Sequence, residues 1–281
     1  MNYRIDEGKI VIEDLSEFDV KHILDCGQVF RYRNEGDCYT LFAKNAKCLL
    51  RKENNCVIID SDNAQFFAEY FDLDRDYSEI KRALIDNDAG IKDAVEFGKG
   101  IRLLNQDPFE TIISFIISAN NNIPRIKKII ERLCAGLGER KDGYYAFPTP
   151  EAMAQADYDF FNSIGAGYRA DYLYKTSRML KDFDFDKVRG ADTKLAGKLL
   201  MALQGVGRKV ADCILLFAFK KTDLFPMDTW SKKIYYSLGY QEDNDIGRMS
   251  DRLVARYGDL AGYAQQYLFY YYRDNKIEVK I

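Results

Sequence analysis

The sequence lacks the residues and segments on which several classes of protein depend. It contains one histidine, His22, and its six cysteines form no CxxC pair, so neither a zinc site nor a structural disulfide framework is expected. No apolar run approaches the length of a membrane span, and the charged N-terminal stretch has no secretory apolar segment. We therefore expect a cytoplasmic protein whose cysteines are small, reduced core residues.

A surplus of positive charge is also missing. The formal net charge is −3 at pH 7 and the sequence pI is about 5.5, which argues against a protein held on nucleic acid by a global positive field. A local basic face is compatible with these values. The 281 residues, 47% of them hydrophobic and 14% aromatic, are enough to bury the core of one or two folded domains.

The spacing of apolar residues changes along the chain. Short segments with strand character, separated by turn-like NEGD and ENN stretches, predict an antiparallel sheet in the first 60 residues. The predicted strands are 10–14, 29–33, 38–44, 47–53 and 55–60. Helical spacing then begins with two segments and continues through nearly all of the chain after residue 91. These helical segments are 63–73 and 77–87. We expect an α+β fold, with a sheet domain and flanking helices in 1–95 and a mostly helical region in 96–281.

Prolines, glycines and asparagines divide the helical region. The apolar segment 108–119 predicts a buried helix, and the NNN run at 120–122 ends it because asparagine side chains compete for backbone hydrogen bonds. Pro124 suits the first turn of the next helix. A further helix is expected after the glycines of SIGAGYRADYLY, and another over 191–203.

The stretch LQGVGRKVADCILLF, which begins at Leu203, places two glycines between helix patterns. Gly205-Val206-Gly207 lets the chain turn within a few residues and bring backbone N–H groups to the surface at a helix start. The N-terminus of a helix with accessible N–H groups can bind a phosphate even in a protein whose net charge is negative. The pattern is a helix-hairpin-helix, which favours a clamp on the nucleic-acid backbone over the alternative of an ordinary turn between helices.

Lys209 follows Gly207 where the next helix becomes apolar. The simplest interpretation is that Lys209 is solvated and contacts a phosphate. If its side chain is instead pressed toward an apolar pocket near a helix N-terminus, its pKa would be lowered and its neutral amine would act as a nucleophile. In LFPMDTW, either Asp228 or Thr229 is placed as the N-cap of the following helix. A carboxylate held there can also stabilise positive charge that develops on a deoxyribose ring.

The segments LQGVGRKVADCI and FPMDTW together resemble the helix-hairpin-helix–Gly/Pro–Asp superfamily of DNA glycosylases. The whole of residues 10–275, leading sheet included, resembles its 8-oxoguanine DNA glycosylase/AP lyase family. The resemblance implies a bifunctional DNA repair enzyme that flips and excises 8-oxoguanine opposite cytosine in double-stranded DNA, with its active site at the domain junction. Lys209 would attack C1′ of the deoxyribose, expel the base and form a Schiff base that permits strand nicking by β-elimination. Asp228 would stabilise the charged sugar.

The same resemblance has implications for cofactors, oligomeric state and cellular location. The chemistry requires no metal, because the nucleophile is an amine. In relatives, the backbone carbonyls of the hairpin bind a cation that bridges to phosphate. We expect a monomer, and in a prokaryote an association with the nucleoid.

The resemblance assigns DNA contacts to two further loops. In SANNNIPRI, Asn120 would fill the gap left by the flipped base and Arg125 would hydrogen-bond the orphaned cytosine. In GAGYRADY, Tyr168 would act as a wedge beside the lesion and Arg169 would also hydrogen-bond the cytosine. The alternatives are helix capping by the asparagines, a surface position for Arg125, and packing or solvation of the Tyr168–Arg169 pair.

A base pocket is implied by residues far apart in the sequence. Gly27 resembles the glycine whose carbonyl accepts the N7–H of 8-oxoguanine, and its alternative is a strand turn. Gln265 and Phe269 share a helix face and match a glutamine that bonds the base edge and a phenylalanine that stacks on it. Cys213 fits the cysteine on the opposite face of the base, unless it is only a core residue. Trp230 departs from the animal pattern, which has histidine there, and puts the surroundings of Asp228 in doubt.

Three other functions compete with this interpretation. A monofunctional alkylated-base glycosylase would rely on the aspartate without a catalytic lysine, so Lys209 argues against it. An endonuclease III-like enzyme would carry a C-terminal four-cysteine cluster motif, and no cysteine follows Cys213. A non-catalytic, structure-specific DNA-binding protein built on the same hairpin remains a separate class.

Overall fold

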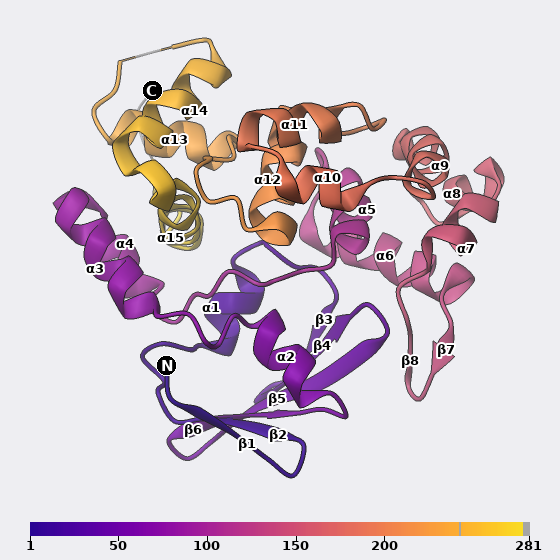
Figure 1. The fold of residues 1–281 in the computed structure, drawn as a ribbon, viewed down its shortest axis with the longest axis horizontal. Coiled ribbons are helices and arrows are strands. Elements are labelled where there is room, and N and C mark those ends of the chain that lie inside the picture. The colour runs from indigo at the N-terminus through magenta and orange to yellow at the C-terminus, as the bar shows by residue number, and fades with distance from the viewer. Residues whose placement is uncertain (242, 278–281) are drawn as a thin grey trace.

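The computed structural model describes residues 1–241 and 243–277. It confirms an α+β fold in which an antiparallel sheet precedes a mostly helical region (Figure 1). The sheet has six strands in the order β1-β2-β6-β5-β4-β3. Their bounds are β1 Tyr3–Asp6, β2 Lys9–Ile12, β3 Tyr32–Asn34, β4 Cys38–Ala43, β5 Ala46–Glu53 and β6 Cys56–Asp60.

Two strands differ from the prediction. β1 was not expected, because most of its residues are exposed and its sequence YRID carries no buried alternation. The segment 29–33 becomes a strand only at Tyr32, since Val29, Phe30 and Arg31 are buried at the junction with the helical region. The predicted strands β4, β5 and β6 form an antiparallel meander, for example with Leu50 opposite Ile59, and β2 pairs antiparallel with β6.

One face of the sheet is covered by two short helices, α1 (Val20–Asp25) and α2 (Ala64–Tyr70). Alternate strand residues such as Ile10, Leu50 and Ile59 are fully buried there, against aromatic side chains such as Phe67. Burial of this face forms a core separate from that of the helical region.

The next two helices pack away from the sheet. α3 (Tyr77–Asn87) and α4 (Lys92–Phe97), joined by the 3₁₀ turn η1 (Ala89–Ile91), contact α14 (Ile246–Tyr257) and α15 (Ala261–Asp274), which η2 (Gly258–Leu260) connects (Figure 1). Arg256 of α14 donates to Asp88 beside α3 at 2.8 Å. These helices therefore share the core of the C-terminal region, although they lie on the N-terminal side of the predicted division at residue 95.

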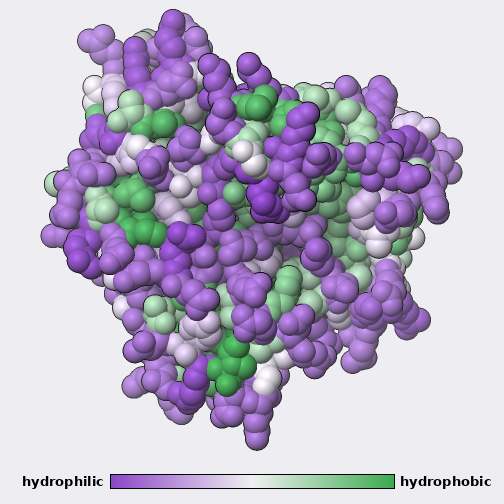
Figure 2. All heavy atoms as spheres, in the orientation of Figure 1, coloured by the Kyte–Doolittle hydropathy of each residue, from purple (hydrophilic) through white to green (hydrophobic). Residues whose placement is uncertain are grey.

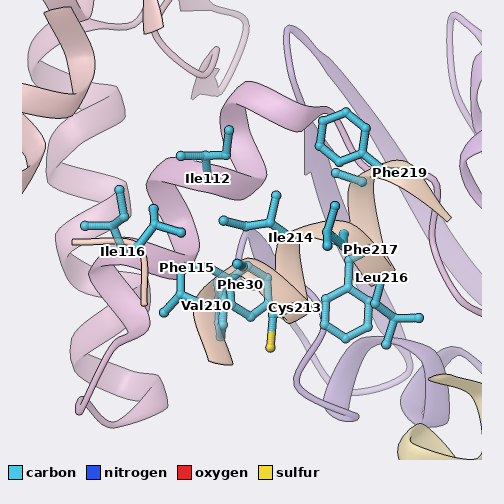
Figure 3. Packing of buried hydrophobic residues seen from close by; sticks show 14 of the residues in the cluster. Phe30, Ile112, Phe115, Ile116, Val210, Cys213, Ile214, Leu216, Phe217 and Phe219 are labelled. Carbon is cyan, nitrogen blue, oxygen red and sulfur yellow. The ribbon is translucent and has the colours of Figure 1, made fainter. Parts of the chain in front are cut away.

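The remaining helices surround a central pair. Ile112, Phe115 and Ile116 of α5 face Val210, Ile214 and Phe217 of α12 (Figure 3), and the rings of Phe115 and Phe217 stack 5.6 Å apart. The helices are α5 Pro108–Ser118, α6 Ile123–Leu137, α7 Pro150–Gln155, α8 Tyr158–Ser163, α9 Arg169–Leu180, α10 Phe185–Gly190, α11 Thr193–Met201, α12 Arg208–Phe219 and α13 Thr229–Ser237. A small hairpin, β7 (Arg140–Lys141) with β8 (Tyr144–Tyr145), was not predicted, because two-residue strands carry no periodicity.

Buried polar contacts fix the sheet to the helices. Arg31 forms an ion pair with Glu110 of α5 at 3.0 Å, and the backbone N–H of Lys44 donates to the same carboxylate at 2.7 Å. Lys220 donates to Asp72 at 2.8 Å and to the carbonyl of Leu103 at 2.7 Å. These contacts hold the segment after Gly27 against α5, and the end of α12 against the segments that follow α2 and α4.

Hydrophilic side chains cover most of the face shown in Figure 2, and hydrophobic ones form smaller patches between them. Among the described residues, no helix combines the length and the apolar character needed to cross a bilayer.

Candidate active site

A small cavity of about 40 Å³ lies where the loop after α1 meets α5, α12 and α15. The structure brings together around it all six residues that were predicted for catalysis and base binding. They are Gly27, Lys209, Cys213, Asp228, Gln265 and Phe269. This proximity does not test the role of each residue. It does bring residues that lie as many as 242 positions apart in the sequence to one cavity.

Lys209 lies in the first turn of α12, half-buried, with its Nζ 5.7 Å from the centroid of the Phe115 ring. The expectation of a lowered pKa is wrong for this structure. The pKa of Lys209 is raised, chiefly by Cys213 and also by Asp228, and these contributions outweigh the opposing effect of burial. In the resting site Lys209 is thus an ammonium ion.

Cys213 lies one helical turn after Lys209 and is 5% exposed. Burial raises the pKa of its thiol to about 11, although Lys209 acts in the opposite direction. At neutral pH the thiol therefore keeps its proton.

Asp228 is the N-cap of α13, as predicted. Its Oδ1 accepts a hydrogen bond from the backbone N–H of Ser231 at 2.8 Å, and the Ser231 hydroxyl donates to the Pro226 carbonyl at 2.9 Å. The cap aims the carboxylate into the cavity that Lys209 lines. Trp230 is half-buried, and the ammonium of Lys233 lies 4.3 Å from its ring, so the indole is engaged by a cation rather than by a carboxylate.

Gly27 adopts a φ of +84°, which favours glycine. A Cβ at this position would lie 3.3 Å from the ring of Phe269 and 3.6 Å from Arg273. Arg273 donates to the carbonyl of Asp25 at 2.6 Å and places its guanidinium 5.2 Å from the Phe269 ring centroid. Arg273 therefore fastens the Gly27 loop to α15 and holds the phenylalanine against it.

The polar wall of the cavity is a pair of glutamines. Gln265 and Gln266 are 4% and 3% exposed, and the Gln266 amide donates to Gln265 Oε1 at 2.9 Å. Among the described residues, Gln266 Oε1 is buried without a hydrogen-bond partner. A buried acceptor without a partner in the protein is well placed to accept a hydrogen bond from a ligand.

The cavity is too small for a purine in this structure, because its volume is only about 40 Å³. The Phe269 ring occupies the space in front of Gly27. Entry of a base therefore requires that Phe269 move away from Gly27.

Two loops predicted to contact DNA lie side by side. Asn120 is exposed with a φ of +50°, and Tyr168 is 56% exposed and donates to the Ala119 carbonyl at 3.2 Å. Arg125 is exposed and donates to the Gly165 carbonyl at 3.2 Å, which links the start of α6 to the second loop.

Arg169 differs from these neighbours because it is 2% exposed. Its guanidinium donates to the carbonyls of Ala119 at 2.9 Å and of Asn120 at 2.8 Å, and it stacks 4.3 Å from the Tyr168 ring centroid. In this structure Arg169 holds the Asn120 loop in place. A direct bond to cytosine remains a prediction that requires release of these contacts.

The glycine hairpin has the expected form. Gly205 has a φ of +82°, and a Cβ there would lie 2.8 Å from the ring of Tyr172. Val206 is buried, whereas Gly207 is the exposed N-cap of α12, with no atom near the position of its absent Cβ. The first N–H groups of α12 are thus open to an anion.

Several lining residues were not predicted. Phe115 and Phe217 form the apolar floor, and nothing distinguishes them in the sequence from other core aromatics. Gln266 also lines the cavity and is adjacent to Gln265. Arg273 does not line the cavity but supports it, and it lies four residues after Phe269 on the same helix face. Within the described residues, no group of three or more His, Cys, Asp or Glu side chains could hold a metal.

The chain matches two family models end to end. Residues 10–112 match the 8-oxoguanine DNA glycosylase N-terminal domain, and residues 113–258 match the HhH-GPD superfamily of base excision DNA repair proteins. A probable N-glycosylase/DNA lyase from Methanothermobacter thermautotrophicus is 34% identical over 71% of this chain and 71% of its own.

Solved structures agree with the family models. The Clostridium acetobutylicum 8-oxoguanine glycosylase/lyase, in complex with double-stranded DNA containing cytosine opposite 8-oxoguanine, is 37% identical over 99% of both chains, with a TM-score of 0.92. The 3-methyladenine DNA glycosylase from Archaeoglobus fulgidus shares the fold at 19% identity and a TM-score of 0.74. The chain therefore belongs to the 8-oxoguanine DNA glycosylase/AP lyase family of the helix-hairpin-helix–Gly/Pro–Asp superfamily.

Proposed function

We propose that this protein excises 8-oxoguanine opposite cytosine from double-stranded DNA and can nick the strand at the resulting site. The observation that carries the proposal is the cavity in which Lys209 and Asp228 meet Gly27, Gln265 and Phe269. A nucleophile, a carboxylate and an aromatic wall are the parts that base excision through an amine requires.

The reaction begins with Lys209 as an ammonium ion, so the first requirement is loss of a proton. The free amine then forms a bond to C1′ as the glycosidic bond breaks, and the base leaves with the bonding electron pair and takes up a proton. Asp228 stabilises the positive charge that develops on the sugar. Opening of the sugar ring gives a Schiff base between Lys209 and C1′. Loss of a C2′ proton then expels the 3′ phosphate by β-elimination.

Base recognition follows from the shape of the cavity. When Phe269 swings away from Gly27, the base can stack between Phe269 and Cys213. The Gly27 carbonyl then accepts from N7–H, which guanine lacks, and the glutamine pair bonds the base edge. Burial of an unmatched carbonyl would reject guanine.

DNA binding uses the loops beside the cavity. Asn120 and Tyr168 enter the distorted duplex, and Arg125 bonds the orphaned cytosine. Arg169 keeps the Asn120 loop in its left-handed turn, and the hairpin Gly205-Val206-Gly207 binds phosphate through backbone N–H groups. A cation at the hairpin carbonyls can bridge to phosphate but takes no part in the chemistry. All these residues come from one chain, so we propose that the protein acts on DNA as a monomer.

The test compares the native protein with Lys209→Gln on a duplex containing one 8-oxoguanine opposite cytosine, with an undamaged duplex beside it. Base release, strand cleavage and duplex binding are measured separately. We expect Lys209→Gln to bind the duplex and to lose both activities. Base release retained by Lys209→Gln would indicate a monofunctional glycosylase driven by Asp228. Binding without release by the native protein would indicate a DNA-binding protein.

A further inference from the structure

A second and much larger cavity lies between β3, β4, α6 and the β7–β8 hairpin. Its volume is about 660 Å³, which falls within the range of small-molecule sites, roughly 300–1,000 Å³. It shares no lining residue with the base pocket. The two adjoin through one contact, since Phe30 lines the larger cavity and packs 5.5 Å from Phe115, which lines the smaller.

The cavity is positively charged in an acidic protein. Its lining contains Arg31, Arg33, Lys127, Arg140 and Lys141, against the carboxylates of Glu131 and Asp142. Three of these cations are engaged: Arg31 by Glu110, Arg33 by Glu131 and Lys141 by Glu139. Within the part of the chain that the structure describes, Lys127 and Arg140 form no ion pair.

Lys127 occupies the centre of this arrangement. It is half-buried, its Nζ lies 3.1 Å from the centroid of the Tyr32 ring, and it donates to the Tyr32 carbonyl at 3.3 Å. Burial lowers its pKa, which Asp25 opposes only in part. A desolvated cation without a carboxylate partner is stabilised when an anion binds to it.

Aromatic side chains form the opposite side. Tyr145 is 38% exposed, and Tyr144 is half-buried with its hydroxyl donating to the Asn45 carbonyl at 2.7 Å. The Tyr144 ring lies 5.2 Å from that of Phe42. An accessible tyrosine face beside free cations is the combination that binds a nucleic-acid base together with its phosphate.

We propose that this cavity binds a nucleotide, with the phosphate at Lys127 and Arg140 and the base stacked on Tyr145. An acidic peptide would use the cations but would gain nothing from an exposed ring. The nucleotide can be free or can be an unpaired nucleotide of a DNA strand. The inference goes beyond the repair function and does not depend on Lys209.

The test is calorimetric titration of the full chain with deoxyadenosine monophosphate and, separately, with single-stranded pentadeoxyadenylate. Lys127→Gln removes a proposed phosphate contact, and Tyr145→Ala removes the ring on which the base would stack. Lys128→Gln is the matched control, since Lys128 is exposed on the same helix but does not line the cavity. Lys209→Gln controls for binding in the base pocket. Circular dichroism checks that each variant is folded.

We expect Lys127→Gln and Tyr145→Ala each to weaken binding at least about tenfold, or about 1.4 kcal/mol, while Lys128→Gln and Lys209→Gln stay within about twofold. Binding of the monophosphate would identify a free nucleotide; binding of the pentanucleotide alone would identify a DNA strand. The proposal is overturned if neither probe binds below about 1 mM. It is also overturned if Tyr145→Ala has no effect, which would leave only an anion site.

Discussion

At the scale of single residues, Lys209 is protonated in the resting site, although the apolar start of its helix suggested the opposite. Cys213 and Asp228 raise its pKa against the effect of burial. Burial also raises the pKa of the Cys213 thiol to about 11, so this thiol keeps its proton at pH 7. The carboxylate thus serves two purposes: it keeps the lysine charged at rest and stabilises the sugar cation later.

The pH dependence of the reaction follows from this arrangement. Formation of the free amine becomes easier as pH rises toward the raised pKa of Lys209, so the rate of borohydride trapping on a duplex with a preformed abasic site should rise into the alkaline range. Asp228→Asn should move this rise to lower pH, because the ammonium loses its counter-charge. Cys213→Ala should also move the rise to lower pH, because Cys213 makes the largest contribution to the raised pKa of Lys209. A rise at the same pH in the native protein and in both variants would contradict this account.

Gly27 offers a test of the base pocket. In Gly27→Ala the backbone keeps a φ of +84°, which costs about 1–2 kcal/mol, and the new Cβ meets Phe269 at 3.3 Å. We expect excision of 8-oxoguanine to fall at least about tenfold, equivalent to about 1.4 kcal/mol, with duplex affinity nearly unchanged.

Gly36→Ala is the matched control for Gly27→Ala. Gly36 has a φ of +83° but no atom within 4 Å of its absent Cβ, so its substitution introduces the backbone strain alone. Equal losses of excision in the two variants, measured by single-turnover kinetics, would mean that the effect is one of stability and not of the pocket.

At the scale of elements, the two glycines of the hairpin between α11 and α12 have different structural roles. Gly205→Ala adds a left-handed strain of about 1–2 kcal/mol and a Cβ 2.8 Å from the Tyr172 ring, so it should lower both the free energy of unfolding and duplex affinity. Gly207→Ala meets open space at a φ of −86° and should fold normally.

Urea denaturation and duplex titration measure the two effects separately. A stable Gly207→Ala with weakened DNA binding would support close approach of a phosphate to the backbone at the start of α12. If Gly205→Ala is as stable as the native protein, the account of the hairpin is incorrect.

Elements with strong local signals were predictable from the sequence. The N-cap at Asp228, the proline in the first turn of α6 and the apolar α5 follow from side-chain chemistry within a few residues. β1 and the β7–β8 hairpin could not be predicted from local sequence. Exposed or two-residue strands are stabilised by pairing with other segments and carry no pattern of their own.

The sequence predicted which residues form the candidate site, but not their burial, their positions relative to one another or their pKa shifts. Motif resemblance identified six lining residues, whereas burial of Arg169, closure of Phe269 over Gly27 and the raised pKa of Lys209 depend on tertiary contacts. Such contacts join residues far apart in the chain, as Arg273 does with Asp25. They leave no local signal in the sequence.

At the scale of the whole molecule, the sheet and the helices are joined by the buried pair of Asp72 and Lys220. Burial alone would raise the pKa of Asp72, but Lys220 and Arg75 hold it below its ordinary value. For Lys220 the balance is reversed, since burial lowers its pKa to about 8 despite Asp72. The pair therefore gives little net stability, yet loss of one partner leaves a buried charge uncompensated.

Asp72→Asn tests this junction, and asparagine is suitable because it tolerates the φ of +56° at this position. We expect a loss of about 3 kcal/mol in the free energy of unfolding at pH 7. Because the pKa of Asp72 is lowered on folding, its contribution is present above about pH 4 and is lost as pH falls further. The difference from the native protein should therefore shrink in acid.

Urea denaturation at pH 7 and below pH 4 measures the effect of Asp72→Asn. Asp171→Asn, which breaks the exposed pair with Lys175, is the control and should cost less than about 1 kcal/mol. Equal effects of the two substitutions would contradict a supporting role for the junction.

The central claim is that Lys209 is the nucleophile of an 8-oxoguanine glycosylase/lyase, and borohydride trapping tests it most directly. The native protein and Lys209→Gln are each incubated with a labelled duplex that carries one 8-oxoguanine opposite cytosine, and with the undamaged duplex. We predict a covalent protein–DNA band that requires both the lesion and Lys209. The claim is contradicted if the native protein releases the base without forming a band, or if Lys209→Gln forms the band as well.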